Sequence, residues 1–168
     1  AVDASDIRPA ALDELRTRAQ RATATATGDA AGSGLGAIRI LTALPPDAVY
    51  DGVLVDAPCS GSGTWRRSPH LKWTTTDADL RSAATLQRTL LDDFSRRVHP
   101  GGRLVYATCS LASCENEVVV ADFLAAHADF EPAPLARTFG ARPRGAGLLI
   151  LPSQHDTDGF FVASLRRR

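Results

Sequence analysis

Residues 51–63 read DGVLVDAPCSGSG, and this stretch decides how the fold is interpreted. A short apolar run of β-branched character, residues 51–56, stops at Asp56 and enters a loop dense in glycine and serine. Such a run, bounded by turn residues, indicates a buried strand that leads into a functional loop. We therefore predict a strand over residues 51–56, with Asp56 and Cys59 at its carboxyl end.

A second stretch of the same kind follows a predicted helix. Residues 77–98 place apolar side chains at helical spacing, and the Pro-Gly-Gly sequence at 100–102 stops that pattern. Residues 103–109, RLVYATC, then predict a strand that closes at Cys109. The carboxyl ends of parallel strands meet at one edge of a sheet, so we expect Cys59 and Cys109 to lie near each other.

The rest of the chain predicts strands alternating with helices. The remaining predicted strands cover residues 1–5, 37–41, 128–135 and 159–165, the remaining helices cover 8–26 and 113–127, and residues 27–36 form a Gly-rich loop. This alternation predicts an α/β fold with a mostly parallel sheet covered on both faces. No internal repeat or second domain is evident, so residues 1–168 are predicted to form one domain.

Composition narrows the function classes. The 168 residues include 19 Lys+Arg and 19 Asp+Glu, which argues against a protein that coats nucleic acid by bulk charge. Three cysteines form neither a disulfide framework nor a Cys-pair zinc site and suit a reducing cytosol. No window approaches the ~18 consecutive apolar residues of a membrane span. We expect a cytoplasmic protein with no membrane partner.

Taken by themselves, the strand-end residues leave several roles open. Cys59 could be an inert core thiol beside a helix-capping Asp56. Paired with Cys109 at the same sheet edge, it could instead belong to a redox couple, a metal site, or a nucleophile with a helper. A metal site needs more His or Cys ligands than the sequence supplies nearby, so we predict no metal.

Two motifs carry a family resemblance. DAPCSGSGTWRRSPHLKW, residues 56–73, and LVYATCSLASCENE, residues 104–117, resemble the RsmB/Sun-type (NOL/NOP/Sun) RNA cytosine-5 methyltransferases. The resemblance implies a Rossmann-like class I S-adenosylmethionine-dependent methyltransferase fold. The family's Gly-rich cofactor loop should precede Asp6, so we expect the carboxyl-terminal part of a catalytic domain, lacking the fold's first strand and helix. The absent strand is central in that fold, which predicts unpaired backbone groups at a sheet edge.

The resemblance also implies roles for individual residues. Cys109 is the nucleophile that adds to C6 of a cytosine, Cys59 assists release of the product, and Asp56 lies between cofactor and base. The implied cofactor is S-adenosyl-L-methionine, held by Asp6, Ile7, Asp56 and Pro58. The implied substrate is RNA, with 16S ribosomal RNA favoured over transfer RNA, and the residues that contact it are Arg66, Arg67 and Lys72.

Competing interpretations accompany these roles. The two thiols could exchange functions, with Cys59 attacking as in DNA cytosine-5 enzymes, although the Thr-Cys-Ser sequence favours Cys109. Asp6 could be a helix N-cap, and the basic residues could be a solvated surface. At the level of the whole chain, the alternatives to an enzyme are a non-catalytic RNA-binding or assembly module and an inactive fragment.

Overall fold

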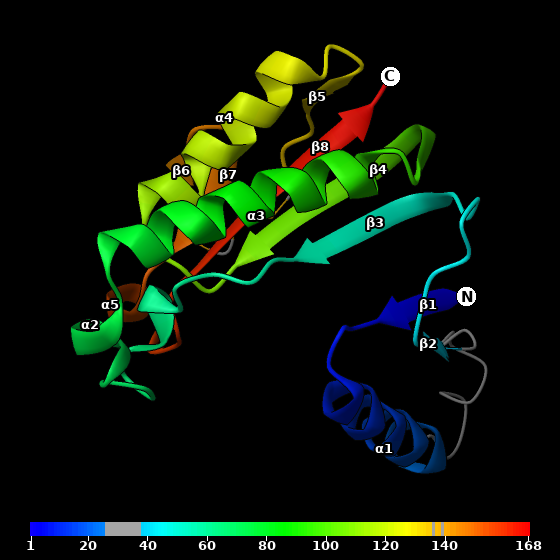
Figure 1. Ribbon diagram of the computed structural model, residues 1–168, viewed down its shortest axis with the longest axis horizontal. Coiled ribbons are helices and arrows are strands. Elements are labelled where there is room, and N and C mark those ends of the chain that lie inside the picture. The colour runs from blue at the N-terminus through cyan, green and yellow to red at the C-terminus, as the bar shows by residue number, and fades with distance from the viewer. Residues whose placement is uncertain (26–37, 136, 139) are drawn as a thin grey trace. The chain divides into compact units, whose positions relative to one another are not determined.

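The computed structural model describes residues 1–25, 38–135, 137–138 and 140–168, and the chain divides into two compact units (Figure 1). The first unit, Ala1–Ala48, holds β1 (Val2–Ser5), α1 (Pro9–Thr25) and β2 (Ile38–Leu41). β1 and β2 pair in parallel, as strands joined through a helix do. The predicted loop over 27–36 lies outside the described residues.

The second unit, Val49–Arg168, is built on a sheet with the order β3-β4-β8-β7-β6, in which β5 also pairs with β8. Its strands are β3 (Tyr50–Asp56), β4 (Val98–Thr108), β5 (Phe130–Pro132), β6 (Arg142–Arg144), β7 (Gly147–Ile150) and β8 (Phe160–Arg167). Only β3 and β4 pair in parallel here, so the prediction of a mostly parallel sheet is wrong for this unit. After α4 the strands are joined by short links, which are too short for parallel crossovers.

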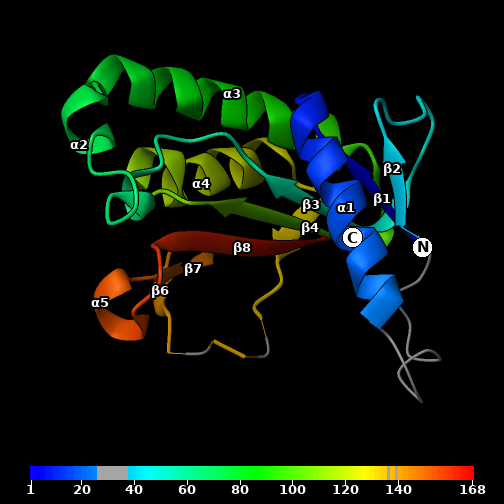
Figure 2. The same cartoon turned by 90° about the horizontal axis from the view of Figure 1, so that it is seen from below.

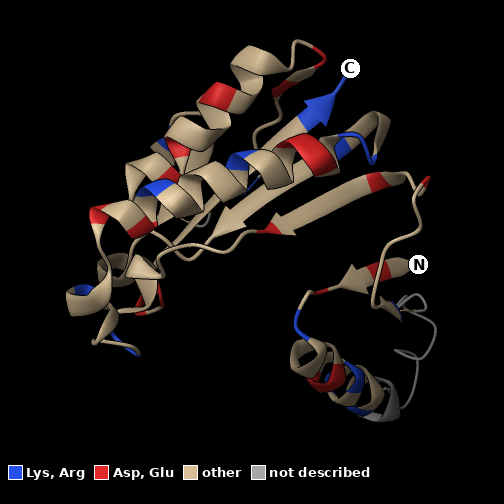
Figure 3. Cartoon of the chain, viewed as in Figure 1, with Lys and Arg blue, Asp and Glu red and all other residues tan. Residues whose placement is uncertain are grey.

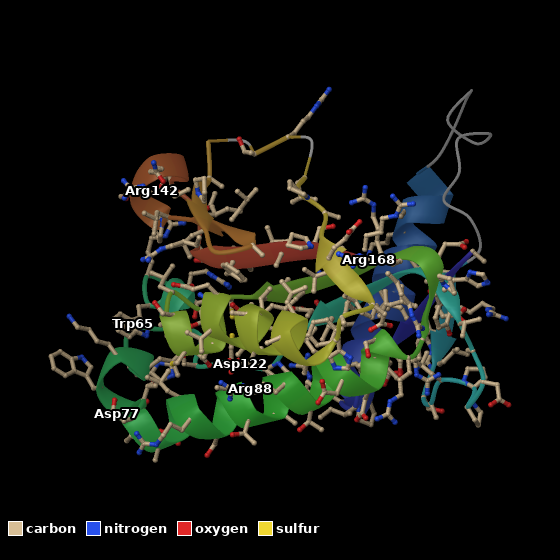
Figure 4. The ribbon with its side chains drawn as sticks, turned by 90° about the horizontal axis from the view of Figure 1, so that it is seen from above. Trp65, Asp77, Arg88, Asp122, Arg142 and Arg168 are labelled. Carbon is tan, nitrogen blue, oxygen red and sulfur yellow. The ribbon has the colours of Figure 1, made fainter. Side chains whose placement is uncertain are left out.

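Two long helices cover this sheet. α3 (Asp77–Ser95) and α4 (Glu117–Ala126) lie on the same face, as Figure 2 shows, whereas the sequence predicted helices on both faces. Arg88 of α3 and Asp122 of α4 form an ion pair that links the two helices (Figure 4). The short helices η2 (Ser62–Thr64), α2 (Leu71–Thr74), η3 (Ser113–Glu115) and α5 (Pro152–His155) lie in the connections.

The core lies between the sheet and these helices. Alternate side chains of β4 and β8 are almost completely buried, and they stand opposite each other in the antiparallel register: Leu104 with Leu165, Tyr106 with Ala163, and Thr108 with Phe161. They pack with apolar side chains of α3 and α4, namely Leu91, Val119, Val120 and Phe123. Burying each large apolar side chain contributes roughly 1.5–3 kcal/mol, which makes β4 a rigid support for the loop that follows it.

The boundary between α3 and β4 differs from the sequence prediction. α3 begins at Asp77 behind a capping box made by Thr76 and Asp79, but it ends at Ser95 instead of reaching Val98. β4 already begins at Val98 and continues through the Pro-Gly-Gly sequence, where Gly101 has a φ of 83°. The β3–β4 register shifts at this point. A glycine with positive φ lets the strand make such an irregularity instead of a separating turn.

Charged side chains of both signs lie on the surface, and β3 is an edge strand of the second unit's sheet. α3 carries both acidic and basic side chains, whereas the two charged residues of α4, Glu117 and Asp122, are both acidic (Figure 3). Among the described residues β3 pairs with β4 alone, and Leu54 of β3 is 67% exposed. This agrees with the expected unpaired edge. No helix within the described ranges is long and apolar enough to cross a membrane.

Candidate active site

Two loops that follow neighbouring parallel strands bring the predicted thiols together. Asp56 is the last residue of β3 and lies opposite Ala107 of β4, and the Ala57 N–H donates to the Ala107 carbonyl at 2.9 Å. Three residues further on, Cys59 Sγ lies 3.3 Å from Cys109 Sγ. The predicted proximity of Cys59 and Cys109 is therefore confirmed.

A third segment packs against these loops through glycine backbone. The Gly63 N–H donates to the Cys109 carbonyl at 2.9 Å, and the Gly159 N–H donates to the Gly63 carbonyl at 2.8 Å. A Cβ atom on Gly63 would lie 2.1 Å from the Gly159 carbonyl oxygen. Only glycine permits so close an approach, so Gly63 allows the loop before β8 to contact the thiol loops.

The two thiols have opposite pKa shifts. The hydrogen bond from Cys59 lowers the pKa of Cys109 to about 7, because a donor to sulfur favours the thiolate. The same hydrogen bond, together with burial, raises the pKa of Cys59 above its ordinary value. The pair therefore combines a reactive thiolate at Cys109 with a protonated thiol at Cys59.

Asp56 and Pro58 are exposed at the end of β3. No hydrogen bond to the Asp56 carboxyl comes from any described residue, whereas its charge acts to raise the pKa of Cys109. Asp56 therefore lies within electrostatic reach of the thiolate and keeps its acceptor oxygens available. Within the described ranges, no group of three or more His, Cys, Asp or Glu side chains could hold a metal ion.

Asp6 and Ile7 belong to the first unit. The Arg8 side chain donates to both carboxyl oxygens of Asp6, at 3.0 and 2.8 Å, and holds the pKa of Asp6 at about 2. Asp6 also accepts from the Arg8 backbone N–H at 2.8 Å. Ile7 is 98% exposed. This end of β1 therefore presents a permanent carboxylate beside an uncovered apolar side chain.

The predicted RNA-contacting arginines have acidic partners that the sequence interpretation missed. Arg66 pairs with Asp156 at 2.7 Å, and Arg67 pairs with Asp158 at 2.5 Å. Lys72 lies over the ring of the neighbouring Trp73 at 5.4 Å. The partners are about ninety positions away along the chain, and no local pattern signals such a contact.

The sequence interpretation also missed a buried carboxyl group beneath the thiols. Glu115 is completely buried and hydrogen-bonds Ser60 and Ser110, the residues that follow Cys59 and Cys109. Gln87 of α3 is buried too and donates to the Pro58 carbonyl at 2.9 Å. The one available signal in the sequence was Gln87, a polar residue at a position that the helical spacing of α3 predicts to be buried.

The chain is similar in sequence and in structure to known proteins. Ribosomal RNA small subunit methyltransferase B of Vibrio cholerae is 42% identical over 119 residues, which are 71% of this chain and 26% of that protein. The crystal structure of PH0851 superposes with a TM-score of 0.82 at 31% identity, over 98% of this chain and 36% of that one. A methyltransferase homolog from Pyrococcus horikoshii gives a TM-score of 0.75 at 27% identity, over 100% and 53%.

These neighbours confirm the predicted fold, the Rossmann-like class I fold of S-adenosylmethionine-dependent methyltransferases. The chain spans about a quarter of the length of the curated relatives it matches. The family model for 16S rRNA methyltransferase RsmB/F matches residues 1–166, nearly the whole sequence. The chain therefore belongs to the RsmB/F family of 16S rRNA methyltransferases.

Proposed function

We propose that the chain supplies catalytic residues for transfer of a methyl group to C5 of a cytosine in 16S ribosomal RNA, through a covalent bond between Cys109 and C6. The observation that carries the proposal is the thiol pair, in which Cys59 Sγ lies 3.3 Å from Cys109 Sγ and the pKa of Cys109 is about 7. Membership of an RNA methyltransferase family supports the class of reaction.

Cys109 has the properties of the attacking nucleophile. At neutral pH about half of a thiol with a pKa near 7 is thiolate. In the proposed reaction the Cys109 thiolate forms a bond to C6, and the electrons of the C5–C6 double bond make C5 nucleophilic. C5 bonds to a methyl carbon and then gives up its proton to a base. The methyl carbon would come from a sulfonium donor, whose S–CH3 bond breaks with its electron pair remaining on sulfur, so that a neutral thioether leaves. The electrons of the C–H bond restore the double bond, and Cys109 leaves as a thiolate.

Cys59 is suited to assist both the attack of Cys109 on C6 and its later departure from C6. Its raised pKa keeps it protonated, so its S–H can donate to the Cys109 sulfur. Such a donor stabilises negative charge on Cys109 before attack and again when that sulfur leaves C6. The opposite assignment, in which Cys59 attacks, is disfavoured because the thiolate form lies at Cys109.

The residues proposed to hold S-adenosylmethionine have suitable chemistry. Asp6 and Asp56 offer carboxylate oxygens that accept hydrogen bonds, and the exposed Ile7 and Pro58 offer apolar surface for a ring. When bound, this cofactor supplies an electrophilic methyl group. Asp6 remains ionised throughout the physiological range because its pKa is about 2.

The RNA is proposed to contact the segment after the Cys59 loop. Trp73 is 82% exposed and Trp65 is 36% exposed, and exposed aromatic rings stack on unpaired bases. Lys72 and Arg66 supply exposed cations beside them. Of the two predicted arginines, Arg66 is the better candidate, because its partner Asp156 is 96% exposed and is easily replaced by a phosphate.

Replacing the nucleophile tests the proposal. In the intact protein, Cys109→Ala is expected to abolish methylation of 16S rRNA, measured as transfer of a labelled methyl group from S-adenosylmethionine. Cys114→Ser is the matched control, since Cys114 has no role in the proposed reaction, and it should leave the rate unchanged. Methylation that persists in Cys109→Ala would contradict the covalent mechanism.

Replacing the assisting thiol gives a different expected result. Cys59→Ala is expected to permit attack and to slow release, so that a covalent protein–RNA complex accumulates on a denaturing gel. The double variant Cys59→Ala/Cys109→Ala should form no such complex. A Cys59→Ala protein that turns over freely with no trapped complex would remove Cys59 from the release step.

A further inference from the structure

The strongest unexplained feature of the second unit is the buried side chain of Glu115. It lies in η3, is completely inaccessible to solvent, and has four hydrogen-bond donors around it. Its Oε1 accepts from the Ser60 N–H at 2.7 Å and from Gln87 Nε2 at 3.4 Å. Its Oε2 accepts from the hydroxyls of Ser60 and Ser110, both at 2.5 Å.

These donors connect Glu115 to both thiol loops. Ser60 directly follows Cys59, and Ser110 directly follows Cys109. One carboxyl group therefore joins the two loops immediately behind their sulfur atoms. All four groups donate to the carboxyl oxygens, and an amide in the same place would turn an N–H₂ group, which cannot accept, toward the two hydroxyls or toward the two N–H donors.

The surrounding network fixes the position of Glu115 itself. The Tyr106 hydroxyl donates to the Glu115 carbonyl at 2.6 Å, which ties η3 to the buried face of β4. Asn116 accepts from the Thr108 hydroxyl at 2.6 Å and donates to the Ser110 carbonyl at 2.9 Å. These hydrogen bonds fix the backbone from which the carboxyl group projects.

Burying a carboxylate among neutral donors is costly, and apolar residues often fill such space with equal or greater stability. We propose that Glu115 is a positioning residue, which holds the Cys59 thiol against Cys109 and thereby sets the reactivity of Cys109. The importance of this positioning for catalysis rests on the proposed function, in which Cys109 is the nucleophile. The thiol chemistry itself is measurable without RNA or cofactor.

Four groups act on the charge of Cys109. Cys59 donates a hydrogen bond that lowers the pKa of Cys109, which is the largest effect, whereas the charges of Asp56 and Glu115 act to raise it. Arg67 is also within electrostatic range of this thiol. Glu115 therefore has two opposed influences: directly, as a negative charge, it raises the pKa, and through the position of Cys59 it lowers the pKa.

Because the two influences are opposite, the direction in which the pKa of Cys109 moves when Glu115 is replaced tests the proposal. In a Cys114→Ser background, the rate of Cys109 alkylation by iodoacetamide is measured against pH, with peptide mass mapping to assign the modified thiol. Glu115→Gln is expected to move the midpoint from near 7 toward the ordinary value of about 8.5, which lowers the rate at pH 7 by about tenfold or more. A midpoint that falls or stays unchanged would overturn the positioning role.

Two comparisons separate positioning from a general loss of structure. Glu117→Gln is the matched control, because Glu117 is a neighbouring glutamate whose ion pair with Arg144 is long, at 3.6 Å, and does not involve the thiol loops. It should leave the midpoint unchanged. In a Cys59→Ala background, Glu115→Gln should no longer raise the midpoint, because the donor that Glu115 positions is absent. A rise that persists there would overturn the proposal.

A milder substitution keeps the test available if Glu115→Gln does not fold. Ser60→Ala removes one of the two Ser60 hydrogen bonds to Glu115 and retains the backbone N–H donor. It is expected to raise the alkylation midpoint in the same direction by a smaller amount, and an unchanged midpoint would count against the proposal. If the midpoints shift as expected while the intact protein methylates no RNA, the positioning role stands and the proposed function fails.

Discussion

Arg66 and Arg67 are neighbours in the sequence, but their acidic partners differ in exposure. Asp156, the partner of Arg66, is 96% exposed, whereas the side chain of Asp158, the partner of Arg67, is 11% exposed. Asp158 Oδ1 is buried without a hydrogen-bond partner among the described residues, so Oδ2 carries the contact with Arg67. Arg66 is therefore available to an RNA phosphate, and Arg67 is engaged in the fold.

Alanine substitutions should separate these two roles. Arg66→Ala is expected to weaken RNA binding, reduce the slope of log K against log[salt] by about 0.7–1, and leave the thermal unfolding midpoint unchanged. Arg67→Ala is expected to lower the thermal unfolding midpoint, because the largely buried Asp158 carboxylate loses its partner. Fluorescence anisotropy and thermal melts measure the two effects. Equal loss of stability in both variants would contradict the distinction.

At the residue scale, the sequence identified groups at strand ends and missed groups that support them. Asp56, Cys59 and Cys109 were found because they follow apolar strands directly, where parallel strands bring their carboxyl ends together. Glu115 was missed because it joins two loops whose serines, Ser60 and Ser110, lie 50 positions apart in the sequence. The family resemblance implied that Arg66 and Arg67 contact RNA, but no sequence pattern indicated their ion pairs with Asp156 and Asp158.

At the element scale, the contact between the Cys59 loop and the segment before β8 depends on Gly63. Gly63→Ala is expected to reduce the free energy of unfolding by at least about 1–3 kcal/mol, because its Cβ would lie 2.1 Å from the Gly159 carbonyl oxygen. Gly52→Ala is the control, since its Cβ would come no closer than 4.0 Å to the Arg103 carbonyl oxygen. Urea unfolding measures both. A Gly63→Ala protein as stable as the control would contradict the close packing.

Elements with strong periodicity were predictable, and short ones were not. The predicted helices over 8–26 and 77–98 correspond to α1 and α3, because their apolar positions repeat over several turns. β6 is three residues long, contains Pro143 and has no buried residue, so it shows no alternation of apolar and polar residues. The antiparallel half of the sheet was missed because it depends on β6 and β7, together with their short connections.

At the scale of the whole molecule, binding of the cofactor tests the role proposed for Asp6 of the first unit. S-adenosylmethionine at 100 times its dissociation constant is expected to stabilise a binding-competent chain by about 2.7 kcal/mol, seen as a higher thermal midpoint. Asp6→Asn should reduce this shift, whereas Asp13→Asn, an exposed carboxylate of α1, should not. A full shift in Asp6→Asn would remove Asp6 from the cofactor site.

The most direct test of the central claim is the bond between Cys109 and the base. RNA that carries 5-fluorocytosine at the target position blocks loss of the C5 substituent, so the protein–RNA bond should persist after methyl transfer. With S-adenosylmethionine present, we predict an adduct that peptide mass mapping places on Cys109, and a rate of formation that rises with pH through about 7, as the thiolate forms. An adduct on Cys59, or none on Cys109, would contradict the assignment of Cys109 as the nucleophile.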